Sequence, residues 1–203
     1  MADKTRRGLF VVFEGCDRSG KSTQAKLLAE RLPNSVSRRF PRRTGALGSL
    51  LDSYLRGSDN LKNAETAHLL FSADRWDASR DILAQLNQGQ NGKNLSKLLI
   101  IKAAQGLDLG WCMAPDRGLP KPDLVIYFDL DPSVAAQRSD YGNERFEKVE
   151  LQARVRQLYM QLKDDTWIVL DADASIEELH ERVFQIVESA RACAAKECGT
   201  LWK

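Results

Sequence analysis

Gly15, Gly20, Lys21 and Ser22 stand in the spacing Gly-x4-Gly-Lys-Ser, which is the pattern of a phosphate-binding loop. Glycines let successive backbone N–H groups converge on one anion, and the N-terminus of a following helix adds a favourable dipole. In such a loop the lysine reaches the outer phosphates of a nucleoside triphosphate, and the serine hydroxyl binds Mg²⁺. The alternative is a glycine-rich turn with an exposed lysine. The motif leaves open whether the terminal phosphate goes to water, to a protein or to a second small molecule.

The segments on both sides of this loop fit the strand–loop–helix order that a phosphate-binding loop requires. Residues 9–15 (LFVVFEG) are a short run of apolar, β-branched and aromatic residues, which predicts a buried strand. Residues 21–32 contain helix formers throughout, with leucines at helical spacing. This order favours the phosphate loop over the exposed turn.

The composition narrows the class of protein. The chain has 203 residues, the size of about one large domain, and we expect residues 1–203 to form one domain. With 30 basic and 28 acidic residues, its charge gives no general argument for nucleic-acid binding. The apolar runs are too short to span a bilayer, and the first residues lack the apolar segment of a signal peptide. The scattered spacing of the cysteines matches neither a zinc site nor a disulfide framework, which favours a reducing compartment, the cytosol or the nucleus.

Strands and helices are predicted to alternate along the rest of the chain. Further strands are predicted at 34–40, 122–130 and 166–172, and helices at 44–57, 63–87, 148–163 and after Ser175. Ser175 and Glu178 predict a capping box at the start of the last helix. This alternation predicts an α/β fold: a P-loop NTPase-type parallel sheet of about five strands with helices on both faces. Ligands of such sheets bind outside the carboxyl ends of the strands.

Three further stretches are candidates for binding the acceptor. Residues 38–44 concentrate four arginines around a proline. Residues 68–76 place Phe71 and Arg75 four positions apart, on one face of a predicted helix. Residues 137–148 form a polar, arginine-bearing loop between two predicted helices. Each stretch also has an ordinary explanation. The first could be a solvated edge, the second a core phenylalanine beside a surface arginine, and the third a simple loop. Their order behind a phosphate loop favours a common site.

In these stretches the sequence resembles the thymidylate kinases of the eukaryotic and poxvirus type. FEGCDRSGKST is similar to the phosphate loop of that family, FPRRT to its Phe-Pro-x-Arg-Thr/Ser motif, and LLFSADRW to its Leu-Phe-Ser-Ala-Asn/Asp-Arg-Trp helix. The segment DLGWCMAPDRGLPKPDL, the lid-like ERFE and the terminal LWK resemble the family as well. The resemblance runs from about residue 9 to residue 203. It implies transfer of the γ-phosphate of ATP to dTMP, giving dTDP.

The resemblance also implies roles that suit the chemistry of the residues. Phe71 would stack on thymine, Arg75 would hydrogen-bond the base edge, and Arg43 would bind the monophosphate. Asp17 would accept a hydrogen bond from the sugar 3′-hydroxyl. The residues implied for ATP are Gly15, Asp17, Arg18, Ser19, Gly20, Lys21, Ser22 and Thr23, with Ser22 also a ligand of Mg²⁺. Those implied for dTMP are Asp17, Phe40, Arg43, Phe71 and Arg75, and those for charge stabilisation and lid closure are Arg18, Lys21, Arg138 and Arg145.

Residues 90–105 (QNGKNLSKLLIIKAAQ) depart from the family pattern, which has a buried strand followed by Asp-Arg-Tyr beside the metal and the acceptor phosphate. Aligning LLII with that strand puts Lys102 where the aspartate belongs, whereas aligning from AAQGLDL leaves NGKNLSK as the strand. Neither alignment restores the site. Three explanations follow: a splicing or gene-prediction error in an ordinary kinase, a genuine but impaired variant, or a nucleotide-binding pseudoenzyme. Arg42 where the family usually has Glu, and Phe146 where it usually has Tyr, are lesser departures.

Two other functions stay open beside the kinase. A non-catalytic nucleotide-binding protein would bind ATP with turnover at background. A basic nucleic-acid-binding module would use Arg38, Arg39, Arg42 and Arg43, but near-neutral net charge and the lack of interleaved aromatics argue against it. For the kinase we expect ATP and Mg²⁺ as cofactors and neither a nucleic acid nor a membrane as partner. The resemblance further implies a homodimer, for which the helices after residue 63 could supply the interface.

Overall fold

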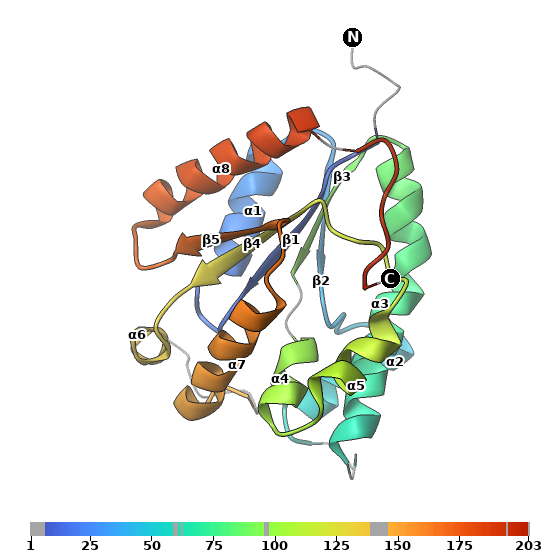
Figure 1. The fold of residues 1–203 in the computed structure, drawn as a ribbon, viewed down its shortest axis with the longest axis vertical. Coiled ribbons are helices and arrows are strands. Elements are labelled where there is room, and N and C mark those ends of the chain that lie inside the picture. The colour runs from blue at the N-terminus through green and yellow to red at the C-terminus, as the bar shows by residue number, and fades with distance from the viewer. Residues whose placement is uncertain are drawn as a thin grey trace.

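A five-stranded parallel sheet forms the centre of the structure (Figure 1). The computed structural model describes residues 7–58, 61, 63–95, 98–138, 146–193 and 195–202, with only the backbone described for residues 93–95, 98 and 99. The strands are β1 (Phe10–Gly15), β2 (Ser35–Arg39), β3 (Asn91–Leu95), β4 (Leu124–Asp129) and β5 (Trp167–Asp171), in the sheet order β2-β3-β1-β4-β5. All neighbouring strands run parallel, which confirms the predicted α/β fold and sheet.

Helices cover both faces of the sheet, as predicted. They are α1 (Lys21–Arg31), α2 (Gly45–Leu55), α3 (Ala64–Asn87), α4 (Leu98–Ala104), α5 (Leu109–Met113), α6 (Pro132–Ala136), α7 (Val149–Leu162) and α8 (Ile176–Cys193), with a 3₁₀ turn at Ala114–Asp116. α1 and α8 pack on one face, and α2, α3, α4, α5 and α7 lie on the other (Figure 1). The five helices expected from sequence are confirmed, and α4, α5 and α6 are short additions to them.

The central strands β1 and β4 are apolar on both faces because helices cover both. On β1, Val11 and Phe13 belong to the core with α1 and α8, whereas Phe10 and Val12 pack against α3. This division follows from the alternation of side chains along a strand. Burial on both sides explains the uninterrupted apolar run that predicts the strand.

Side chains cap the two longest helices. Before α3, the Asn63 side chain accepts a hydrogen bond from Thr66 N at 2.9 Å. At α8, Ser175 Oγ accepts from Glu178 N at 3.2 Å, and the Glu178 carboxylate accepts from Ser175 N at 3.3 Å. This reciprocal pair is the predicted capping box.

The atypical segment supplies the strand between β2 and β1. Gly92 of β3 lies opposite Phe10 on one side and Val36 on the other, so both edges of β3 are paired. The buried Asn91 side chain joins this strand to its neighbour, because its Oδ1 accepts a hydrogen bond from Leu9 N at 3.0 Å. NGKNL therefore holds the strand position, and LLII, the other candidate, begins helix α4. A fully paired backbone compensates for the polar composition of β3.

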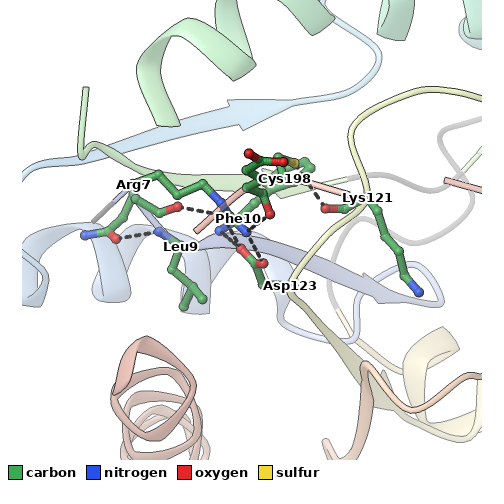
Figure 2. Close-up of polar contacts among 9 residues, drawn as sticks. Arg7, Leu9, Phe10, Lys121, Asp123 and Cys198 are labelled. Carbon is green, nitrogen blue, oxygen red and sulfur yellow. Dashed lines mark hydrogen bonds and ion pairs between the residues drawn. The ribbon is translucent and has the colours of Figure 1, made fainter. Parts of the chain in front are cut away.

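A buried ion pair ties the amino edge of the sheet together (Figure 2). The Arg7 guanidinium donates to both carboxylate oxygens of Asp123, at 2.5 and 2.7 Å, and the Arg7 side chain is 3% exposed. Asp123 also accepts from Phe10 N at 2.8 Å, and Arg7 donates to Glu197 O at 3.2 Å. One pair thus joins the start of β1, the residue before β4 and the C-terminal segment.

Candidate active site

A cavity of about 800 Å³ lies at the carboxyl ends of the strands, where the loops after β1, β2 and β5 meet. This is the position expected for a ligand of an open parallel sheet. The cavity brings together most of the residues predicted for ATP and for the acceptor phosphate. The predicted residues that line it are Asp17, Arg18, Ser19, Gly20, Lys21, Ser22, Thr23, Phe40, Arg43 and Arg138.

The loop after β1 has the backbone of a phosphate cradle. Gly15 has φ 140°, and a Cβ there would stand 2.5 Å from Phe128 O, so only glycine fits. Gly20, at the start of α1, has φ 91°. The Lys21 ammonium bends back over the loop and donates to Gly15 O at 2.8 Å. Burial lowers the pKa of Lys21 to about 8, so this charge is held at a desolvation cost that an anion would offset.

Asp17 is held by a residue that the sequence analysis missed. Gln152 of α7 is 1% exposed; its amide accepts from Asp17 N at 3.2 Å and donates to Asp17 Oδ2 at 3.3 Å. The signal was available, because Gln152 interrupts the buried face that α7 otherwise fills with Val155 and Tyr159. A buried glutamine on an apolar helix face needs polar partners, and a loop carboxylate is one.

Arg18 and Arg138 are linked through the phosphate loop. Arg138 donates to Arg18 O at 2.7 Å and to Ala172 O at 3.3 Å, which ties the end of α6 to the loops after β1 and β5. Arg18 itself lies 3.4 Å from the carboxylate of Glu147, a second cavity residue missed from sequence. Arg145, the other arginine expected in the lid, lies outside the described residues.

The loop after β2 is positioned by α2. Arg43 donates to Asp52 Oδ1 at 2.6 Å, and this contact is the main reason that the pKa of Asp52 lies below its usual value. The backbone of Arg42 and Arg43 packs on Gly48, where a Cβ would stand 2.9 Å from Arg42 O. Arg43 therefore lines the cavity from a loop that packs closely on α2.

Phe71 and Arg75 do not reach this cavity. Phe71 is 1% exposed and packs with Ile100 and Ile101 of α4, and its ring meets that of Tyr54 edge-on at 5.9 Å. Arg75 pairs with Asp116 at 2.7 Å and lines a separate cavity of about 150 Å³ behind Phe40, which borders both spaces. The structure thus separates the predicted base-binding pair from the predicted phosphate-binding residues: Phe71 lies in a core cluster with residues of α4, and Arg75 lines the smaller cavity.

Lys102 also lies elsewhere than one alignment predicts. Its ammonium is buried, donates to the Tyr54 hydroxyl and to Gln105 Oε1 at 3.0 Å, and lies over the Tyr54 and Phe146 rings at 4.8 and 5.0 Å. It does not line the 800 Å³ cavity. The prediction of an inverted charge beside the phosphates is wrong, because Lys102 lies in α4 and not at the end of a strand.

Comparisons with known proteins agree with this architecture. The thymidylate kinase family model matches residues 13–183. A thymidylate kinase of Schizosaccharomyces pombe is 41% identical, covering 92% of this chain and 94% of the relative, and that of Homo sapiens is 40% identical, covering 98% and 99%. A solved thymidylate kinase structure from Candida albicans superposes with a TM-score of 0.86 at 31% identity, over 96% of this chain and 98% of the other. The chain belongs to the thymidylate kinase family.

Few carboxylates of this family member are placed to hold a metal ion. Among the residues that the structure describes, no three His, Cys, Asp or Glu side chains gather as a metal site. Asp17, Glu147 and the Ser22 hydroxyl line the cavity. Mg²⁺ takes most of its oxygen ligands from phosphates and water in nucleotide sites, so these oxygen donors fit it as partners of a nucleotide.

Among the described helices of this family member, none has the length and apolar character that a membrane span requires.

Proposed function

We propose that this chain transfers the γ-phosphoryl group of ATP to dTMP, producing ADP and dTDP. The observation that carries the proposal is that a formed phosphate loop and Arg43 border one cavity of about 800 Å³. That volume suits a nucleotide with the phosphate of a second one. Membership of the thymidylate kinase family supports ATP as donor and dTMP as acceptor.

In the proposed reaction, an oxygen of the dTMP phosphate attacks the γ-phosphorus of ATP while the bond to the β–γ bridging oxygen breaks. Lys21 and Arg18 neutralise charge on the transferring group, and Arg43 orients the acceptor phosphate. Mg²⁺, held by the phosphates and the Ser22 hydroxyl, would neutralise further charge on them. Arg138, which lines the cavity, and Arg145, which lies outside the described residues, are the proposed lid arginines that would keep water from the donor. Phosphoryl transfer depends mainly on positioning and charge stabilisation, and we propose that these residues provide both.

The thymine and sugar sites form part of the proposal. Asp17 accepts from the 3′-hydroxyl and is held for this by Gln152. Phe71 stacks on the base and Arg75 binds its edge once the core cluster that Phe71 shares with Ile101 has opened. The acceptor therefore binds at the cost of displacing part of α4, which predicts weaker dTMP binding than an open site would give.

The test is ADP formation from MgATP with dTMP, run beside dUMP, dCMP and AMP. We expect dTMP to be preferred over dUMP by about 10–200-fold, the contribution of one methyl group in an apolar pocket. Lys21→Met should abolish turnover. ATP binding with turnover at background would favour the non-catalytic alternative. A chain that gains activity when residues 90–105 are replaced by a strand followed by Asp-Arg-Tyr would place the defect in that segment.

We also propose that the chain forms a homodimer through α2, α3 and α5. These helices lie together on one side of the molecule (Figure 1) and expose Leu50, Leu69, Trp76 and Trp111. Leu69 and Trp76 are seven residues apart and so share one face of α3. Sedimentation equilibrium should show a dimer that Leu69→Glu weakens. Ile176→Glu on α8, an equally apolar and exposed position on the other side, should leave it intact.

A mononucleotide rather than a nucleic acid is the proposed ligand of the arginine-rich loop. Arg38 donates to Gln85, Arg42 to Asp74 and Asp77, and Arg43 to Asp52, so three of its four arginines have local partners. Binding to DNA or RNA should accordingly be weak and fall steeply with salt.

All four cysteines are free thiols, which supports a reducing compartment such as the cytosol or nucleus.

A further inference from the structure

Arg39 is a cavity residue for which neither the motifs nor the proposed function gives a role. It is the last residue of β2, lies opposite Leu95 at the end of β3, and so stands at the carboxyl edge of the sheet. Its side chain is exposed and lines the 800 Å³ cavity. The next residue, Phe40, also lines this cavity.

The cavity holds five cations and two carboxylates among the described residues, and Arg39 differs from the other four cations in its contacts. Lys21 and Arg138 donate to backbone carbonyls, Arg18 pairs with Glu147, and Arg43 pairs with Asp52. Arg39 has no hydrogen-bond or ion-pair partner within the part of the chain that the structure describes. Arg39 and Lys21 both line this cavity. Two cations so placed repel each other unless an anion lies between them.

We propose that Arg39, which precedes Phe40, and Arg43, which follows it, together bind the phosphate of the acceptor nucleotide. The inference rests on the proposed function and extends it by a residue. Arg43 already uses part of its guanidinium on Asp52, whereas none of the five N–H donors of Arg39 is engaged by the residues that the structure describes. A planar guanidinium suits bidentate binding of a phosphate. Because Lys21 lines the same cavity, a phosphate held by Arg39 would share this cavity with the phosphates of the donor.

The neighbouring Arg38 provides a matched control. Because side chains alternate along a strand, Arg38 points to the other face of β2, where it donates to Gln85 Oε1 at 2.8 Å. Arg38 does not line the cavity. Removing either arginine changes the net charge of the chain by the same amount, so a difference between the two variants reports position and not overall charge.

The experiment is calorimetric titration of the full chain with dTMP and, separately, with thymidine, which lacks the phosphate. Arg39→Ala should weaken dTMP binding roughly 10- to 100-fold, as expected for a lost charged hydrogen bond, and leave thymidine binding unchanged. Arg39→Lys should lose less, and Arg38→Ala should behave as the unmodified chain. Thermal unfolding of each variant checks that it is folded.

Two results would overturn the inference while leaving the proposed function intact: dTMP binding by Arg39→Ala equal to that of the unmodified chain, or an equal loss for thymidine. If the unmodified chain binds ATP but no dTMP, the proposed function fails, and the inference that rests on it fails too. These outcomes are distinguishable because the first two require measurable dTMP binding by the unmodified chain.

Discussion

Arg42 and Asp74 bind each other through both backbone and side chain. Asp74 accepts from Arg42 N at 2.9 Å and from Arg42 Nε at 2.6 Å, and its side chain is 1% exposed. Asp77 takes the other end of the guanidinium at 2.6 Å. Arg42, which replaces the usual Glu of the family, therefore points to α3 and not into the cavity. The pair fastens the loop that carries Arg43 to the helix that carries Phe71 and Arg75.

Arg42→Ala should lower the free energy of unfolding by about 2 kcal/mol, because it leaves the buried Asp74 carboxylate without its charged partner. It should also weaken dTMP binding, since the loop is no longer fastened. Adding Asp74→Asn should recover part of the stability, because no uncompensated charge stays buried. Urea unfolding and calorimetry measure both effects. If Arg42→Ala alone is as stable as the unmodified chain, the Arg42–Asp74 pair does not hold the loop.

Gly48→Ala tests the other support of this loop. In a helix this change usually stabilises by up to about 1 kcal/mol. Here we expect destabilisation and a raised KM for dTMP, because the new Cβ would stand 2.9 Å from Arg42 O. Ser49→Ala, at an exposed position one residue along α2, is the control and should change neither quantity. A stabilised Gly48→Ala variant with normal KM would mean that the loop moves freely.

The pKa of Lys21 predicts how ATP binding depends on pH. Burial lowers this pKa to about 8, so the free enzyme loses the Lys21 charge as the pH rises through that value. We expect kcat/KM for ATP to fall tenfold per pH unit above about pH 8. The bound phosphates raise the pKa, so kcat should fall only at higher pH. In Lys21→Arg, whose side chain does not titrate in this range, the fall should disappear whatever activity is left.

Ile101→Ala tests whether α4 obstructs the base site. The variant should lose about 2–5 kcal/mol of unfolding free energy, as buried large-to-small changes do. It should nevertheless bind dTMP more tightly, because the Phe71 ring becomes accessible. Leu28→Ala is the control: Leu28 is equally buried but belongs to the core of α1 and α8 on the other face of the sheet, so its stability loss should come without a gain in affinity. Equal affinities of the two variants would contradict the obstruction.

Asp123→Ala should cost about 3–5 kcal/mol of unfolding free energy, because it leaves the Arg7 guanidinium buried without its carboxylate (Figure 2). The catalytic parameters of the folded variant should not change, since the pair lies at the amino edge of the sheet. Asp164→Ala breaks the nearby Lys121–Asp164 pair, which is exposed, and should cost about 1 kcal/mol or less. Guanidinium unfolding separates the two cases.

Most of the fold is predictable from the sequence, because β1 and β4 are uninterrupted apolar runs and α8 has a clear apolar face with a capping box at its start. β3 is the exception. Its residues NGKNL have neither alternation nor an apolar run, and the strand exists because β2 and β1 supply partners on both edges. A partner strand is tertiary information that a local pattern does not hold. The same lack of local signal left the short helices α5 and α6 unpredicted.

The candidate site divides in the same way. The phosphate loop is predictable because its chemistry lies in consecutive residues. Gln152 and Glu147 were missed because their importance comes from contacts with Asp17 and Arg18, more than a hundred residues earlier in the chain. Phe71 was assigned to the site by resemblance, and its burial depends on what α4 brings against it. Spacing identifies residues that act together along the chain and cannot show what fills the space between them.

The polar composition of β3 has a consequence for local opening of the sheet. The core of α1 and α8 rests on β1 and β4, and none of the described residues of β3 belongs to it. That half of the sheet can therefore persist while β2 and β3 open locally. Amide hydrogens of β3 should exchange with solvent faster than those of β4, although both strands are paired on two sides. The end of β2 that carries Arg39 would then be the part of the cavity wall that fluctuates first, while the phosphate loop stays formed and the Arg42–Asp74 pair keeps the Arg43 loop on α3.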